Sequence, residues 1–208
     1  MKWKRTPVGP VAANCYLVWN ESKNCLIIDP GGEDEKIRAA IKKLNLSPRA
    51  ILLTHCHFDH IAALEEIRQS YSIPVYVHEN EAKWLLDPAL NGSQLFNLGT
   101  VRCKPADRFF TTEGTLDVEG FQFTLFETPG HSPGSVSFYF EDDCFVISGD
   151  ALFYGSIGRT DLPGGNHKEL IKSIKEKLLT LPDDTIVLPG HDQETTINQE
   201  KEHNPFLK

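Results

Sequence analysis

The chain has 208 residues, of which 40% are hydrophobic and 24% are charged, so it is long enough to bury a core within one domain. Lys and Arg number 21 and Asp and Glu number 29; the resulting net charge of −8 argues against a general nucleic-acid-binding protein, which carries a basic face. No apolar run approaches the roughly 18 residues that cross a bilayer, and polar, Gly and Pro residues over 7–14 argue against a signal peptide.

The N-terminal half alternates strand and helix patterns. Apolar runs at 14–20 and 24–30 predict two strands joined by a polar turn. Apolar residues at helical spacing predict a helix over 33–46, whose first turn holds acidic residues where the helix dipole favours them. A strand, a helix, a strand and a short helix are then expected at 49–54, 59–71, 74–78 and 79–87.

Residues 87–107 predict a long loop, which in a compact domain is commonly mobile or functional. The C-terminal half is richer in strands, and its pattern otherwise repeats the first half. We therefore expect one α/β domain over 1–208, with two packed sheets and helices outside. The expected elements are a hairpin at 114–129, strands at 135–141 and 144–150, a helix at 166–181, a strand at 185–190 and a helix at 194–206.

The stretch "LLTHCHFDH" (52–60) places four possible metal ligands after an apolar strand. His55 and His57 are two residues apart in an extended segment, so their side chains point the same way, about 6.6 Å apart. Two imidazoles at that spacing can converge on one ion. Asp59 and His60 lie where the chain turns into a helix and therefore indicate a second position. Cys56 points to the opposite side and is interpreted as packing.

Three later strand ends carry a further ligand beside glycine: His131 in "TPGHSPGS", Asp150 in "SGDALF" and His191 in "LPGHD". Glycine permits the tight turns that such a site needs. These nitrogen and oxygen ligands suit zinc, iron or manganese. Two ions about 3.5–4 Å apart lower the pKa of bound water towards about 7, so the chemistry needs no serine or cysteine nucleophile. The predicted sets are His55, His57 and His131 for one ion, Asp59, His60 and His191 for the other, and Asp150 as the bridge.

These motifs, in this order and at these intervals, resemble the metallo-β-lactamase superfamily from "DPGG" to "GHD". The resemblance implies a four-layer αβ/βα sandwich with the metals at one edge of the two sheets. It implies the same two ligand sets, with Asp59 and Asp150 acting in catalysis. Asp29 matches an acid that lies near the metal centre in the family, and a turn cap is the alternative interpretation.

Residues 153–166 resemble the corresponding segment of glyoxalase II-like thioesterases and persulfide dioxygenases. Arg159 matches a basic residue that contacts a glutathione carboxylate there, and a guanidinium suits such a bidentate contact. The alternative for Arg159 is a surface ion pair with Asp161. Tyr154 is a second candidate for the substrate pocket. The chain lacks the helical C-terminal region of long glyoxalase II enzymes, which predicts an open pocket or one completed by residues 87–107 or by a partner subunit.

The favoured function is hydrolysis of S-2-hydroxyacyl-glutathione or a similar acyl-thiol ester by two divalent ions, with zinc first and iron or manganese as alternatives. A persulfide dioxygenase with one iron, held by a subset such as His55, His131 and Asp150, is the second hypothesis. A phosphodiesterase or nuclease and a non-enzymatic metal-binding protein rank below it. We expect a small-molecule partner, and neither nucleic acid nor a membrane. We also expect a cytoplasmic protein, since the five scattered cysteines include no CxxC pair.

Overall fold

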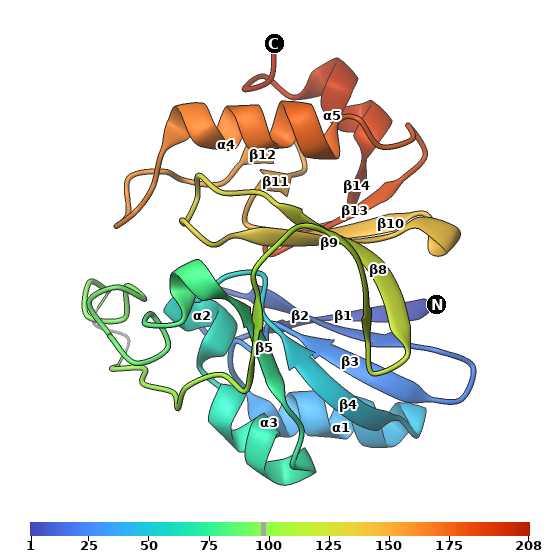
Figure 1. Cartoon of the computed structure of the whole chain (residues 1–208), viewed down its shortest axis with the longest axis vertical. Coiled ribbons are helices and arrows are strands. Elements are labelled where there is room, and N and C mark those ends of the chain that lie inside the picture. The colour runs from blue at the N-terminus through green and yellow to red at the C-terminus, as the bar shows by residue number, and fades with distance from the viewer. Residues whose placement is uncertain (97–98) are drawn as a thin grey trace. The chain divides into compact units, whose positions relative to one another are not determined.

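The computed structural model describes residues 1–96 and 99–208, and its internal contacts divide them into two compact units, 1–111 and 112–208 (Figure 1). Each unit is built on one six-stranded sheet. Within the described residues, no helix has the length and apolarity needed to cross a membrane.

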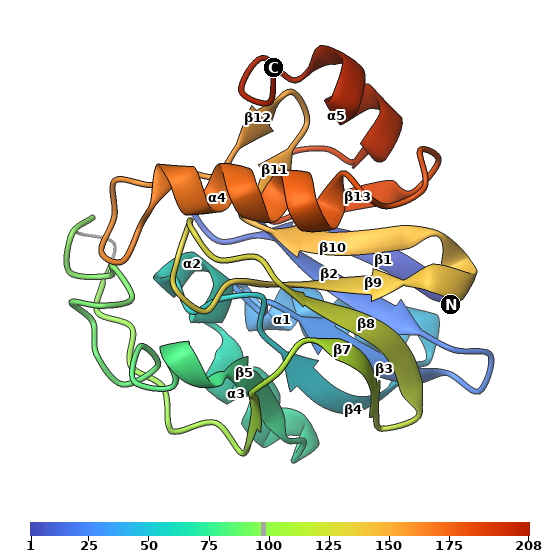
Figure 2. The ribbon, with the colours of Figure 1, turned by 45° about the horizontal axis from the view of Figure 1, so that its top comes forward.

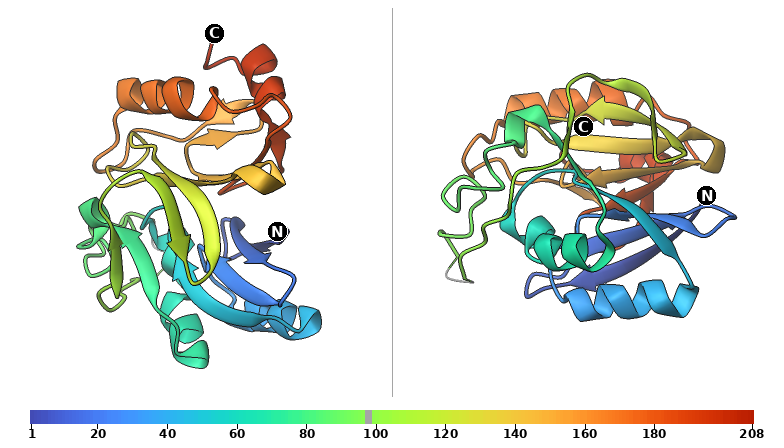
Figure 3. Two further views of the ribbon diagram at one scale, coloured as in Figure 1. Left: turned by 45° about the vertical axis from the view of Figure 1, so that its right-hand side comes forward. Right: turned by 60° about the horizontal axis from the view of Figure 1, so that its bottom comes forward.

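In unit 1 the sheet order is β1-β2-β3-β4-β5-β6. The first three strands are antiparallel and the last four are parallel. Helices α1 and α3 lie along one face of this sheet (Figure 3). The elements are β1 (Lys2–Val8), β2 (Ala13–Trp19), β3 (Asn24–Ile28), α1 (Asp34–Leu44), β4 (Ser47–Leu52), α2 (Phe58–Ile61), α3 (Leu64–Tyr71), β5 (Val75–His78), the 3₁₀ turn η1 (Glu79–Glu81) and β6 (Arg108–Phe110).

Unit 1 differs from the sequence prediction at several places, among them strand β6, which was not predicted. Strand β1 was not predicted, because its polar residues and Pro7 hide its pairing with the fully buried strand β2. The predicted helix 59–71 is divided into α2 and α3. It breaks because the N–H of Ala63 donates to the carbonyl of Pro30 at 2.9 Å, which ties the chain to the loop after β3.

The predicted helix at 79–87 is a 3₁₀ turn followed by turns, with the ring of His78 accepting from the N–H of Asn80. The described part of the 87–107 loop is organised around the buried Asn91. Its amide donates to the carbonyls of Trp84 and Val101 and accepts from the N–H of Ser93. Positions 97 and 98 of that predicted loop lie outside the described residues.

In unit 2 the sheet order is β14-β13-β10-β9-β8-β7, with β10 and β13 parallel and the other neighbours antiparallel. Helix α4 crosses one face of this sheet (Figure 2). The elements are β7 (Gly114–Val118), β8 (Phe121–Glu127), β9 (Val136–Phe140), the 3₁₀ turn η2 (Glu141–Asp143), β10 (Phe145–Gly149), β11 (Leu152–Phe153), β12 (Ser156–Ile157), α4 (His167–Ser173), the π-helical turn η3 (Ile174–Leu178), β13 (Ile186–Pro189), β14 (Thr195–Thr196) and α5 (Ile197–His203).

The strands predicted for unit 2 are present, and two short elements were not predicted. The hairpin β11–β12 has only two residues in each strand, too few for a periodic pattern. Strand β14 occupies the start of the predicted helix 194–206, so α5 begins only at Ile197, where the Thr196 hydroxyl accepts from the N–H of Gln199.

Four of the five cysteines are buried and all five are free thiols. Burial raises the pKa of Cys25 and of Cys103 to about 12, and it raises the pKa of Cys15 and of Cys56 well above the usual range. Since the thiolate is the nucleophile, these four groups are protonated and unreactive at pH 8. An aromatic disulfide reagent should therefore release one rapid equivalent from native protein, at Cys144, and five after denaturation. A second rapid equivalent from native protein would contradict this.

Candidate metal centre

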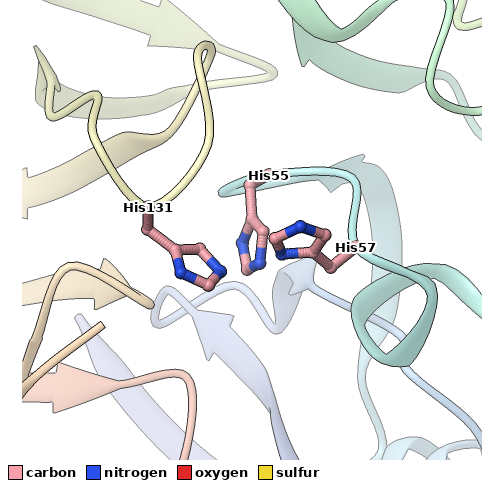
Figure 4. A group of neighbouring side chains, drawn as sticks. All are labelled: His55, His57 and His131. Atoms are coloured by element: carbon pink, nitrogen blue, oxygen red, sulfur yellow. The ribbon is translucent and has the colours of Figure 1, made fainter. Parts of the chain in front are cut away.

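Strand β4 and the extended residues after it position His55 and His57. The last three residues of β4 are buried, as are both histidines, so this segment passes through the interior. The two rings meet edge to face with centroids 4.9 Å apart (Figure 4). A ligand atom of each lies within 4.8 Å of a ligand atom of the other. The imidazoles of His55 and His57 thus lie close together, as a shared ion would require.

Asp59 and His60 follow at once in the first turn of α2. His57 is extended and precedes the helix, so the chain changes direction between the two pairs of ligands. His60 Nε2 lies 3.7 Å from Asp59 Oδ2, and the rings of His55 and His60 have centroids 4.2 Å apart. One strand-to-helix turn therefore presents two adjacent pairs of ligands.

Asp29 supports this turn from the loop after β3. Its carboxylate is buried and accepts from the N–H of Thr54 at 2.8 Å and from the Thr54 hydroxyl at 2.6 Å. Its Oδ2 also lies 3.0 Å from His60 Nδ1. A carboxylate on Nδ1 fixes the tautomer and directs Nε2 towards a ligand position, as in carboxylate–histidine–metal arrangements. Asp29 is thus more than a turn cap.

Glu81 is a buried acid that the sequence analysis did not select. Its carboxylate accepts from the N–H of Cys56, the residue between His55 and His57. Desolvation is the main cause of the raised pKa of the Cys56 thiol, and the negative charge of Glu81 adds to it. The available signal was its helical spacing to the apolar Leu85, which indicates one buried face.

The described part of the 87–107 loop and the turn before it pack beside His57 and Phe58. The ring centroids of Trp84 and His57 lie 5.6 Å apart, and those of Phe96 and Phe58 lie 5.5 Å apart. The N–H of Phe58 donates to the carbonyl of Asn91. This segment is therefore tied to the start of α2 rather than detached from it.

Unit 2 supplies His131 after β8, Asp150 after β10 and His191 after β13. Asp150 Oδ2 lies 3.5 Å from His131 Nε2 and 3.6 Å from His191 Nε2. The structure thus brings these three predicted residues together, with the carboxylate between the two imidazoles. The cause is the sheet: β10 and β13 are parallel neighbours, so their carboxyl ends meet at one edge, where the N–H of Gly190 donates to the carbonyl of Gly149.

The segment after Asp150 returns to His131 and His191. His131 Nδ1 lies 2.8 Å from the carbonyl oxygen of Arg159, which directs Nε2 towards Asp150. Figure 4 shows His131 on its loop between β8 and β9. The ring of Phe153 meets that of His191 edge-on, with centroids 6.2 Å apart.

The side chains of the two predicted substrate contacts lie at the surface of unit 2. The guanidinium of Arg159 is about half exposed and binds Asp161 through Nε at 2.7 Å and Nη2 at 2.8 Å. These hydrogen bonds lower the pKa of Asp161 to about 2. The alternative interpretation of Arg159, an ion pair with Asp161, is therefore the arrangement observed. Tyr154 is 50% exposed at the tip of the β11–β12 hairpin.

Residues 8–191 match a family model whose description is "Metallo-beta-lactamase superfamily". The chain belongs to this superfamily. Two curated relatives cover almost its whole length. A protein of Bacillus subtilis named probable metallo-hydrolase YqgX is 55% identical, over 100% of this chain and 98% of its own. The hydroxyacylglutathione hydrolase GloC of Haemophilus influenzae is 41% identical, over 97% of this chain and 95% of its own.

Solved structures agree on the fold. The crystal structure of BLEG-1 B3 metallo-β-lactamase matches with a TM-score of 0.97 at 50% identity, over 100% of both chains. The crystal structure of TTHA1623 in a di-iron-bound form matches with a TM-score of 0.88 at 40% identity, over 98% of this chain and 100% of that one. The predicted family and fold class, those of the metallo-β-lactamase superfamily, are confirmed.

The donor set of each unit fits a divalent metal ion. The imidazoles of His60 and His131 are held at Nδ1 by a carboxylate and a backbone carbonyl, which is the arrangement that orients metal-binding histidines. The carboxylates of Asp59 and Asp150 complete sets of nitrogen and oxygen donors without a thiolate. Such sets suit zinc, iron or manganese.

Replacing Asp29 with Asn tests its support of the metal centre. The amide presents an NH₂ group either to the N–H of Thr54, which lies against Oδ1 in the native chain, or to the Thr54 hydroxyl and His60 Nδ1, which both lie against Oδ2. We expect zinc affinity to fall about 10–100-fold, as for other residues behind metal ligands. Competition with a chelating dye measures this. Asp34→Asn, which affects a surface pair with Arg38, is the control and should bind like wild type.

Proposed function

We propose that the chain is a thioesterase with two metal ions that hydrolyses S-2-hydroxyacyl-glutathione or a similar acyl-thiol ester. The observation that carries the proposal is the position of Asp150, whose Oδ2 lies almost equally far from His131 and His191. A carboxylate between two imidazoles is suited to bridge two ions. The proposed ligand sets are His55, His57 and His131 for one ion, and Asp59, His60 and His191 for the other.

Two bound divalent ions would supply Lewis acids and a water of lowered pKa. The chain's own residues hold and orient the reacting groups. Asp59, beside His60, is placed to accept a hydrogen bond from that water and so to aim it at the thioester carbonyl. Asp29 and the carbonyl of Arg159 keep the Nε2 atoms of His60 and His131 directed to their ligand positions. The curated relative named for hydroxyacylglutathione hydrolysis supports a thioester substrate.

Arg159 and Tyr154 are the proposed substrate contacts. The guanidinium of Arg159 already holds Asp161, so a substrate carboxylate would compete with that pair. Both side chains are half exposed, which leaves them accessible to a small molecule. We further propose zinc as the metal, the cytoplasm as the location and a small-molecule thioester, rather than nucleic acid, as the partner.

The test is metal content together with thioester hydrolysis. Protein purified without chelator should carry two divalent ions per chain and hydrolyse lactoyl-glutathione. Chelation should abolish the activity, and zinc should restore it. The thioesterase proposal fails if protein with two ions is inactive on a panel of lactoyl, acetyl and aryl thiol esters of glutathione and of other thiols.

The solved relative described as a β-lactamase gives a second candidate, hydrolysis of a β-lactam amide. The same preparation should therefore be tested on penicillins, cephalosporins and carbapenems. Thioester turnover that exceeds β-lactam turnover supports the first proposal, and the reverse ratio supports the second. Oxygen consumption with glutathione persulfide by protein carrying one iron would instead indicate the dioxygenase.

A further inference from the structure

Glu200 is a fully buried carboxylate in helix α5, away from the candidate ligands along the chain. It accepts from the N–H of Gly155 at 3.0–3.2 Å, from the hydroxyl of Thr195 at 2.7 Å and from the amide of Asn204 at 2.7 Å. All three partners are donors. A buried negative charge is costly unless hydrogen bonds compensate it, so this carboxylate is retained for the contacts that it makes.

Asn204 contacts both Glu200 and the hairpin β11–β12. It is fully buried, and its amide donates to the carbonyl of Ser156 at 3.0 Å as well as to Glu200. Glu200 and Asn204 therefore hold the hairpin at two neighbouring points, the N–H of Gly155 in the turn and the carbonyl of Ser156 at the start of β12. Figure 2 shows this hairpin beside α5.

The hairpin and the residues next to it lie beside the three candidate ligands of unit 2. The hairpin starts at Leu152, two residues after Asp150, and its first strand carries Phe153, which packs edge-on against His191. After the second strand, the N–H of Gly158 donates to the carbonyl of Ala151 and closes the loop. The next carbonyl, that of Arg159, lies against His131 Nδ1.

We infer that Glu200 and Asn204 are positioning residues, which hold His131, Asp150 and His191 in place through the hairpin β11–β12. The inference rests on the proposed function, since it needs these three side chains to be metal ligands. Glutamine is a poorer acceptor than Glu200, because its NH₂ group would face either the Asn204 amide, which is a donor, or the Thr195 hydroxyl, which would have to turn in order to accept. The ligands would then lose the fixed hairpin that sets their spacing.

The experiment compares Glu200→Gln and Asn204→Ala with Glu202→Gln, which makes the same change on an exposed residue of α5. Zinc content and zinc affinity are measured at 25 °C by chelator competition, and the Tm is measured on metal-free protein. We expect Glu200→Gln to weaken zinc binding by at least about tenfold, as for other residues that orient metal ligands. Asn204→Ala should weaken it several-fold, and Glu202→Gln should match wild type.

A merely structural role has a different signature: the Tm of metal-free Glu200→Gln falls while its zinc affinity at 25 °C stays that of wild type, which would overturn the inference. If Glu200→Gln does not fold, Asn204→Ala decides alone, and unchanged zinc affinity in that variant overturns the inference. Wild-type protein that binds no zinc would remove the proposed function as well. Wild type with two ions and variants that bind equally well would remove only the positioning role.

Discussion

Asp150→Ala is expected to abolish thioester hydrolysis and to lower the metal content below two ions per chain. The native carboxylate lies 3.5 Å from His131 Nε2 and 3.6 Å from His191 Nε2, so its removal takes away the proposed bridging carboxylate. Mutation of a residue that only supports a metal ligand lowers metal affinity or activity about 10–100-fold, and the loss of a bridging ligand should lower them further. Steady-state kinetics on lactoyl-glutathione and metal analysis measure both effects.

The matched control is Asp142→Ala, which removes an exposed carboxylate from the turn between β9 and β10. This variant should keep wild-type activity and metal content. Asp150→Asn keeps the volume of the side chain and should be as inactive as Asp150→Ala, because an amide ligates divalent ions poorly. Activity of Asp150→Ala within tenfold of wild type would remove Asp150 from the proposed bridge.

Gly31→Ala is expected to damage both stability and activity. A Cβ at position 31 would lie 1.7 Å from the carbonyl oxygen of Asp59 and 3.3 Å from the Cα of His60. Relief requires the loop after β3 or the first turn of α2 to move. Overpacking of this kind costs about 1–3 kcal/mol, and displacement of a catalytic group by about 1 Å can cost 100-fold in rate. Urea unfolding and kcat/KM measure the two effects.

Gly120→Ala separates the steric effect from a general effect of replacing glycine. A Cβ there has no atom within 4 Å, but φ is +82°, so the cost is the left-handed backbone, about 1–2 kcal/mol. Its kcat/KM should equal that of wild type. If Gly31→Ala loses stability to the same extent as Gly120→Ala and keeps full activity, then the close approach to Asp59 has no role in positioning the site.

The local pattern around position 55 was sufficient to predict much of unit 1. Alternation along a strand follows from backbone geometry, so the closeness of the His55 and His57 rings could be predicted from two residue numbers. Asp59 and His60 were expected to point elsewhere, but the centroid of the His60 ring lies 4.2 Å from that of His55, so His60 is not separated from that pair. Strand β1 and the break at Ala63 could not be predicted in this way, because each depends on a partner elsewhere in the chain.

The buried acids show the same limit. Glu81 and Glu200 are glutamates in helical segments, where exposure is the usual expectation, and both are fully buried. Their partners include the N–H groups of Cys56 and Gly155, backbone atoms that every sequence has and no pattern singles out. Arg159 differs again, since its ion pair with Asp161, two residues away, was open to prediction and is present.

The sequence by itself determined the superfamily and the fold class through the resemblance of its motifs. It also proposed the kinds of ligand, because strand alternation, glycine turns and ligand chemistry are local properties. The tertiary structure alone decided which atoms support those ligands. Asp29 reaches His60 across 31 positions, and Arg159 reaches His131 across 28. The spacing of Asp150 from His131 and His191 likewise depends on strands that become neighbours only when the sheet forms. Hydrogen bonds between distant segments exist only in the folded chain, which is why a motif can name the ligands but not what holds them.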